Sequence, residues 1–213
     1  MKLSDLHATN PYTGFNVKKY PQNVDGWGSD APIFDELVER VRPSLIIEIG
    51  SWKGASAIHM ADASKKIGLD TAIVCVDTWL GSLEMWTDQS DPSRYGSLGL
   101  KHGYPQLYYQ FLANVVRAGH QDCIIPFPTT SLIGARWFGK RSIQADLIYI
   151  DASHDYDDVL ADMRAYWPLV RPGGVLFGDD RLTFIDVDRA LTTFSREIGV
   201  QPIADERFWQ LHK

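Results

Sequence analysis

The chain consists of short apolar runs that alternate with longer segments of helical periodicity. A strand that is followed by a helix and a second strand usually returns to the same sheet in parallel, so this alternation produces βαβ units. We therefore predict an α/β fold with a mostly parallel sheet and helices on both faces. The predicted strands are Leu45–Ile49, Ala72–Asp77, Cys123–Phe127, Ala145–Asp151 and Val175–Phe177.

Turn and edge signals refine this prediction. Two short strands close the chain, near 200–204 and 208–212, and the brief turn between them predicts an antiparallel hairpin at or near a sheet edge. Pro126 has no backbone N–H to donate to a neighbouring strand, so we expect the third strand to lie at an edge of the sheet. Pro172-Gly173-Gly174 is a predicted turn. The predicted helices are one that starts at Ser29 or Asp30 with Pro32 in its first turn, and Ala55–Lys66, Pro105–Ala118, Ser131–Phe138, Asp155–Leu169 and Ile185–Ile198.

The length of 213 residues fits one domain. We expect 1–28 to form an irregular N-terminal arm and 29–213 to form the domain. The interval 78–104 is too long for an ordinary connection and contains Trp79 and Trp86. We interpret it as a lid-like insertion over the site; the alternative is a surface insertion that only packs its aromatic side chains.

Composition narrows the classes of partner. The formal net charge is −6 and basic residues form no long run, so we expect no nucleic-acid partner. No apolar run approaches the roughly 20 residues of a membrane helix, and the first residues lack the apolar core of a signal peptide. Cys75 and Cys123 lie in strand-like runs and are expected to be reduced core thiols. These features predict a cytoplasmic protein without a membrane partner, and the aromatic-rich arm offers a surface for a homodimer.

Acidic residues stand at the carboxyl ends of several predicted strands. They are Glu48 with Gly50, Asp77, Asp151, and Asp179 with Asp180. Ligands of open α/β sheets bind outside the carboxyl ends of the strands, so these side chains predict a site there. A single aspartate at a strand end is also common in turns, but here every one of these ends carries an acid.

The loop from Gly50 to Gly54 connects the first strand to a helix. Gly50 permits a tight turn, and Gly54 lets the helix start close to the sheet and a ligand. The spacing matches neither G-x-G-x-x-G nor the phosphate loop. Asp77 ends the next strand, where a carboxylate can accept hydrogen bonds from ribose hydroxyls. An adenosine-containing ligand is therefore indicated, either S-adenosylmethionine (SAM) or NAD.

Four motifs occur in order: Glu48-x-Gly50-x-x-x-Gly54, Val76-Asp77, Asp146–Asp151 and Leu169–Gly174. Together they resemble the class I SAM-dependent methyltransferases over roughly residues 29 to 213. The resemblance implies a Rossmann-like seven-stranded sheet of order 3-2-1-4-5-7-6. It also implies a cofactor site in which Glu48, Gly50 and Ser51 line the methionine part, Asp77 holds the ribose, Thr78 or Trp79 borders the adenine, and Ser131 lies near the adenine edge.

A further segment, Asp151-Ala152-Ser153-His154, together with Gly178-Asp179-Asp180, is similar to metal-dependent small-molecule O-methyltransferases, notably those that act on sugars. The similarity implies that Asp151, Asp179 and Asp180 hold a divalent cation. Neighbouring strands lie about 4.8 Å apart, so their terminal carboxylates converge, and oxygen ligands suit Mg²⁺. The alternative is a polar turn without a metal. Arg181 departs from the pattern of the sugar-methylating group.

The predicted activity is transfer of a methyl group from SAM to a hydroxyl of a small-molecule acceptor, with Mg²⁺ assistance. His154 is the expected general base beside the catalytic Asp151, because imidazole accepts protons near neutral pH; a solvated histidine at a helix start is the alternative. Two other functions remain open: an NAD-dependent oxidoreductase on a similar sheet, which the absent G-x-G-x-x-G disfavours, and a non-catalytic adenosyl-binding module.

Overall fold

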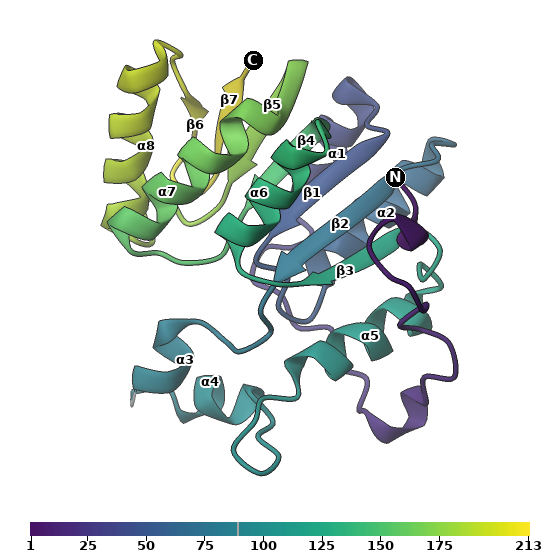
Figure 1. Ribbon diagram of the computed structural model, residues 1–213. Helices are drawn as coiled ribbons and strands as arrows, with labels where there is room; N and C mark the ends of the chain where they lie inside the picture. Colours follow the sequence, from purple (N-terminus) through teal and green to yellow (C-terminus); the bar gives the residue numbers. More distant parts are fainter. Residues whose placement is uncertain (89) are drawn as a thin grey trace.

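A computed structural model describes residues 1–88 and 90–213. Its sheet has seven strands in the order β3-β2-β1-β4-β5-β7-β6 (Figure 1). The pairs among β1 to β5 are parallel, whereas β7 pairs antiparallel with both β5 and β6. The predicted fold, strand order and closing hairpin are confirmed. The strands are β1 Leu45–Ile49, β2 Ala72–Asp77, β3 Ile124–Pro128, β4 Ala145–Ile150, β5 Val170–Gly178, β6 Ile203–Ala204 and β7 Trp209–His212.

Helices cover both faces of the sheet, and each face has its own apolar core. Successive side chains of a strand point to opposite faces, so Ile46 joins the core under α1, α2 and α5, while Ile47 joins the core under α6, α7 and α8. Figure 1 shows α6 and α7 in front of the sheet. The six helices are α1 Pro32–Val41, α2 Ala55–Lys66, α5 Leu107–Ala118, α6 Ser131–Lys140, α7 Tyr156–Tyr166 and α8 Ile185–Ile198.

The N-terminal arm packs on the domain along β3 and α5. It contains two short 3-10 helices, Leu3–Asp5 and Val17–Lys19. Tyr12 is buried, and its hydroxyl donates to the carbonyl of Ile124 at 2.9 Å. Arg117 of α5 donates to three carbonyls of the arm, including that of Pro21 at 2.8 Å. The arm is therefore attached along much of its length.

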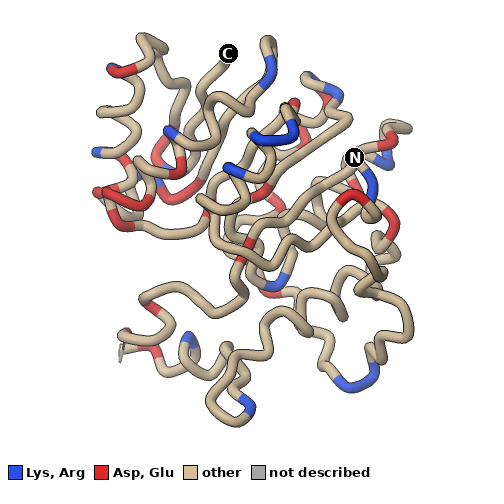
Figure 2. Tube along the Cα trace, viewed as in Figure 1, with Lys and Arg blue, Asp and Glu red and all other residues tan. Residues whose placement is uncertain are grey.

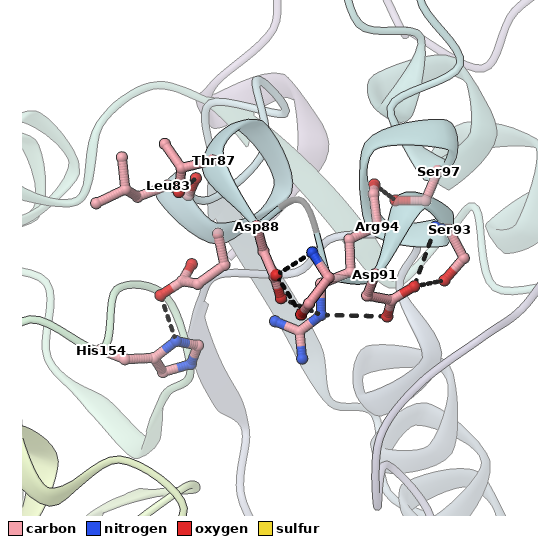
Figure 3. Close-up of polar contacts among 10 residues, drawn as sticks. Leu83, Thr87, Asp88, Asp91, Ser93, Arg94, Ser97 and His154 are labelled. Carbon is pink, nitrogen blue, oxygen red and sulfur yellow. Dashed lines mark hydrogen bonds and ion pairs between the residues drawn. The ribbon is translucent and has the colours of Figure 1, made fainter.

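The insertion 78–104 contains two short helices, α3 Leu83–Thr87 and α4 Pro92–Ser97, below the sheet in Figure 1. Helix α4 starts with a recognisable cap, because Asp91 accepts from the amide of Ser93 and proline follows it. Arg94 lies beside Asp88 and Asp91 and ties the helices together (Figure 3). The sequence prediction of an irregular segment missed these helices; Gln89 lies outside the described residues.

Several predicted boundaries were wrong by a few residues. Helix α1 is capped by Ala31, without a side-chain hydrogen bond, rather than by Ser29 or Asp30. The expected turn Pro172–Gly174 lies inside β5, where the register with β4 shifts. Helix α5 begins at Leu107, with Gln106 as its N-cap residue, rather than at Pro105. Cys75 and Cys123 are free thiols, the first buried and the second half-buried. Among the described helices, none is long and apolar enough to span a membrane.

Asp146 at the start of β4 fastens the amino ends of the central strands. Its Oδ2 accepts from the amide of Ser44 at 2.7 Å, from the Ser44 hydroxyl at 2.9 Å and from the amide of Leu45 at 2.8 Å, while Oδ1 accepts from Arg171. Burial alone would raise the pKa of this carboxyl, but the hydrogen bonds outweigh it and hold the pKa below its usual range. This network lies at the sheet end opposite the predicted site.

We predict that Asp146→Asn lowers the free energy of unfolding by about 2 kcal/mol at pH 7, because charge-assisted hydrogen bonds to buried donors are lost. A depressed folded-state pKa contributes stability above the unfolded pKa of 3.8 and loses it as the pH falls through the folded value. The difference in the free energy of unfolding between variant and wild type should therefore become smaller below pH 3.8, as measured by urea titration. Asp186→Asn, which removes an exposed pair with Arg189, is the control. Equal stabilities at pH 7 would refute this role for Asp146.

Candidate functional site

The carboxyl ends of β1 to β5 meet along one edge of a cavity of about 620 Å³. Its lining follows the strand order: Thr129 to Leu132 after β3, Asp77 at β2, Gly50 to Trp52 after β1, Asp151 after β4, and Asp179 with Asp180 after β5. Figure 2 shows acidic positions gathered around the lower ends of these strands. The structure therefore brings the predicted strand-end residues together along one edge.

Asp77 holds the loop that follows β1. Its Oδ2 accepts from the amides of Ser51 and Trp52, both at 2.8 Å, and its Oδ1 accepts from the amide of Trp79 at 2.7 Å. Gly50 is required at the turn, because its φ is +81° and a Cβ would lie 2.0 Å from the carbonyl oxygen of Asp151. The loop is thus rigidly placed beside the cavity. Thr78, Ser51 and Ser131 line the same cavity, as their predicted roles require.

Glu48 lies beneath the cavity and not in its lining. It is fully buried, and its carboxylate accepts from the hydroxyls of Ser51, at 2.5 Å, and Ser56. Burial raises its pKa, although these hydroxyl groups oppose the shift. In this structure Glu48 supports the loop that carries Ser51, and its predicted contact with the methionine part of the cofactor stays a prediction.

Trp79 and Gly54 also lie outside the cavity lining. The Trp79 ring is 2% exposed, packs against Tyr108 and Phe111, and donates from Nε1 to the carbonyl of Trp52 at 2.9 Å. A Cβ on Gly54 would lie 2.9 Å from the Phe111 ring, so this glycine allows close helix packing. Both residues therefore have structural roles here, and their predicted ligand contacts stay predictions. Burial of an aromatic side chain in an insertion has no local sequence signal that separates it from a ligand contact.

Asp151, His154 and Asp180 form the one group among the described residues whose ligand atoms suit a metal ion, all within 4.8 Å of one another. Nε2 of His154 lies 3.1 Å from Asp180 Oδ2. Nδ1 of His154 lies 3.2 Å from Oε1 of Glu84 on α3, the contact drawn as the dashed line at His154 in Figure 3. The imidazole also stacks on Phe184, with ring centroids 3.9 Å apart. The insertion therefore reaches the predicted catalytic centre through Glu84, a residue that the sequence did not indicate.

The charges of this group determine its protonation. Burial raises the pKa of Asp151 to about 7, and the charges of Asp179 and Asp180 add to the shift. Burial disfavours the His154 imidazolium, but its hydrogen bonds to Asp180 and Glu84 outweigh burial and raise the pKa to about 9. Both ring nitrogens then donate to carboxylates. In this protonated state His154 has no proton-accepting nitrogen, so its predicted role as general base requires the neutral imidazole.

Asp179 is held by an arginine instead of facing the metal-binding group. Arg207 donates from Nε to Asp179 Oδ1 and from Nη2 to Asp179 Oδ2, both at 2.7 Å, and the Asp179 side chain is 2% exposed. Asp179 is thus engaged by Arg207, whereas His154 lies with Asp151 and Asp180 in the group that could hold a metal ion. The predicted role of Asp179 as a metal ligand stays a prediction. Arg207 was missed because it lies on the closing hairpin, far from every motif. Arg181 instead pairs with Asp188 on α8.

Asp162 is a second acid that the motifs did not indicate. It lies on α7, is 4% exposed, and lines the cavity near Ser131. Tyr166, one turn further along α7, donates to the Ser131 carbonyl at 2.8 Å, so this face of α7 abuts the start of α6. Burial raises the pKa of Asp162 to about 6, against a hydrogen bond from Ser131. At neutral pH the folded protein therefore carries a poorly solvated carboxylate at the cavity wall.

We predict that Asp162→Asn stabilises the protein by about 2 kcal/mol at pH 8 and has no such effect at pH 3.5. Above the folded pKa of about 6, folding must bury a charge that the unfolded chain, with a pKa of 3.8, keeps solvated; below 3.8 both states are protonated. Melting temperatures at the two pH values check this. Asp157→Asn, an exposed neighbour on α7, should change little at either pH. A uniform effect of Asp162→Asn at both pH values would contradict the burial argument.

Structural comparison places this fold among methyltransferases. The O-methyltransferase from Bacillus cereus in complex with SAH matches 99% of this chain and 90% of its own, with 16% identity and a TM-score of 0.57. The O-methyltransferase TomG from Streptomyces achromogenes, involved in tomaymycin synthesis and solved with SAM, matches 100% of this chain and 98% of its own, with 14% identity and a TM-score of 0.59.

Sequence comparison supplies the family. Protein y4gI of Sinorhizobium fredii, described as uncharacterised, is 24% identical over 184 residues, which are 84% of this chain. The chain spans only 17% of the length of that relative. A family model described as a methyltransferase domain matches residues 47–181, which are more than half of the chain and include the loop after β1 and the ends of β2, β4 and β5. The chain therefore belongs to the methyltransferase-domain family.

Proposed function

We propose that the chain is a SAM-dependent methyltransferase that transfers a methyl group to a hydroxyl oxygen of a small molecule. The observation that carries this proposal is the single cavity with two unlike ends. One end contains the loop held by Asp77, and the other contains the group of Asp151, His154 and Asp180. The family membership supports methyl transfer, and the chemistry of the two ends supports an adenosyl ligand beside an oxygen acceptor.

Asp77 can still accept a hydrogen bond from a ribose hydroxyl. A carboxylate offers about four acceptor sites, and three are taken by the amides of Ser51, Trp52 and Trp79. The remaining site on Oδ1 suits a ribose hydroxyl. The same three bonds fix the loop before a ligand arrives, which reduces the ordering cost of binding. Alignment is the main contribution that a protein makes to transfer from a reactive sulfonium, and it supplies roughly 7–11 kcal/mol.

The residues at the other end fit a divalent cation. Two carboxylates and an imidazole present ligand atoms within 4.8 Å of one another, and the raised pKa of Asp151 reports buried negative charge that lacks a full counter-charge. When bound, such a cation acts as a Lewis acid that lowers the pKa of an acceptor hydroxyl. The two carboxylates suit Mg²⁺ and Mn²⁺, whereas an imidazole favours softer transition-metal ions, so we propose a site for either ion in which Asp151 and Asp180 are the principal ligands. A bound cation requires the neutral form of His154.

We predict that SAH binds the full chain and that Asp77→Asn weakens its binding at least tenfold. The amide retains one acceptor oxygen but opposes the loop N–H groups with its own donors. Calorimetric titration with SAH, and separately with NAD, measures this. Asp186→Asn on α8 should leave SAH affinity unchanged. Binding of NAD in preference to SAH would support the oxidoreductase alternative and reject this proposal.

We predict that Mn²⁺ binds the protein and that Asp180→Asn weakens this binding at least tenfold while SAH affinity stays within threefold. Asp180 has a left-handed φ of +61°, a conformation that asparagine also tolerates, so the substitution removes charge without straining the turn. Electron paramagnetic resonance of free Mn²⁺ gives the bound fraction. Asp155→Asn is the matched control, because Asp155 lines the same cavity outside the ligand group. Unchanged Mn²⁺ binding in Asp180→Asn would remove the cation from the proposal.

A further inference from the structure

Residues 23–29, called the strap below, lie where the N-terminal arm meets the domain and form part of the cavity lining. Asp25, Gly26, Trp27 and Ser29 line the same cavity as the loop after β1 and the acids that follow β5. The strap therefore shares one cavity with both ends of the proposed site. The predicted domain scheme treated this segment as an appendage, because its sequence has no periodicity.

One end of the strap is attached to the loop after β1. Lys53, which is 4% exposed, donates from Nζ to Asn23 Oδ1 and to Asp25 Oδ2, both at 2.7 Å. Asn114 of α5 donates to the Asn23 carbonyl at 2.7 Å and to the Lys53 carbonyl at 2.9 Å. These are buried or partly buried contacts, so this end is firmly held.

The middle of the strap rests on a pair of stacked rings. Trp27 lies parallel to Trp52, with ring centroids 4.6 Å apart and planes 8° apart. Trp27 is nonetheless 60% exposed. Stacking of two aromatic rings is a modest interaction, which alone does not keep an exposed segment closed. A second attachment beyond Trp27 is needed.

Arg207 provides that attachment. The Nη2 that binds Asp179 also donates to the Trp27 carbonyl at 2.6 Å, so one guanidinium joins the strap to the end of β5. Gly28 crosses directly over it: a Cβ at Gly28 would lie 2.4 Å from Arg207 Cζ, and its φ is +64°. The amide of Arg181 donates to the Arg207 carbonyl at 2.9 Å, which ties the backbone of the hairpin to the same strand end.

We propose that Arg207 is a positioning residue that holds the strap closed over the cavity through Asp179 and thereby retains the adenosyl ligand. The retention step rests on the proposed function. Asp179 anchors the Arg207 side chain that holds the strap. Its two parallel hydrogen bonds fix the orientation of the guanidinium, which a lysine ammonium cannot reproduce. Arg207→Lys keeps the positive charge beside the buried carboxylate but cannot bind Asp179 and the Trp27 carbonyl in the same geometry.

The test measures amide hydrogen exchange and SAH release in the full chain. In Arg207→Lys we expect residues 23–29 to exchange at least tenfold faster, with β1 to β5 unchanged, and SAH to dissociate at least fivefold faster in stopped flow. Arg164→Lys is the matched control, because Arg164 makes a bidentate pair with Glu197 on the exposed surface. If Arg207 acts through Asp179, adding Arg207→Lys to Asp179→Asn should accelerate strap exchange little further.

Gly28→Ala provides an independent variant, because it keeps the chemistry of Arg207 and Asp179 while the new methyl group forces the strap and the guanidinium apart at a backbone position with a φ of +64°. It should accelerate strap exchange and SAH release as Arg207→Lys does. Unchanged strap exchange in both variants overturns the proposal, as does faster strap exchange without faster SAH release. Absence of SAH binding in the wild type would reject the proposed function and ligand retention, while the exchange data would still decide whether Arg207 closes the strap.

Discussion

Parallel strands bring their carboxyl ends to one edge, and this chain places an acid at four of those ends. Buried or crowded carboxylates repel one another and lose solvation, so each needs donors or a positive charge nearby. The chain meets this requirement with a different partner for each acid. Glu48 receives hydroxyl groups, Asp77 receives backbone amides, Asp179 receives Arg207 and Asp180 receives His154. The architecture of the site follows from these pairings.

Asp151 is the acid with the weakest compensation. It accepts from the Tyr149 hydroxyl at 3.0 Å, and two further carboxylates lie nearby. Its raised pKa reflects this lack of compensation, whereas the pKa of Asp180 is lowered because the hydrogen bond and charge of His154 outweigh its burial. A cation would therefore add most beside Asp151. Two neighbouring acids of this cavity wall therefore differ in how strongly they hold a proton.

The sequence predicted the features that depend on local periodicity. Apolar runs located β1 to β5 because buried parallel strands need them, and the residue after each run located the edge of the sheet. Contacts across long separations were not predictable. Nothing near Asp179 indicates that Arg207 will reach it from the hairpin, and nothing near His154 indicates Glu84. The same limitation explains Trp79, whose burial depends on α5.

Asp179 and Asp180, which follow each other at the end of β5, link the strap on one side of the cavity to helix α3 on the other. Asp179 binds Arg207, which holds the strap, whereas Asp180 binds His154, which in turn contacts Glu84 on α3. The left-handed backbone at Asp180 turns the chain sharply at this point, so the two carboxylates serve different partners. Because both walls attach to one rigid strand end, their positions relative to the loop held by Asp77 are set by the register of the sheet. The arm and the insertion, which are the least regular parts of the chain, therefore acquire defined positions from its most regular part.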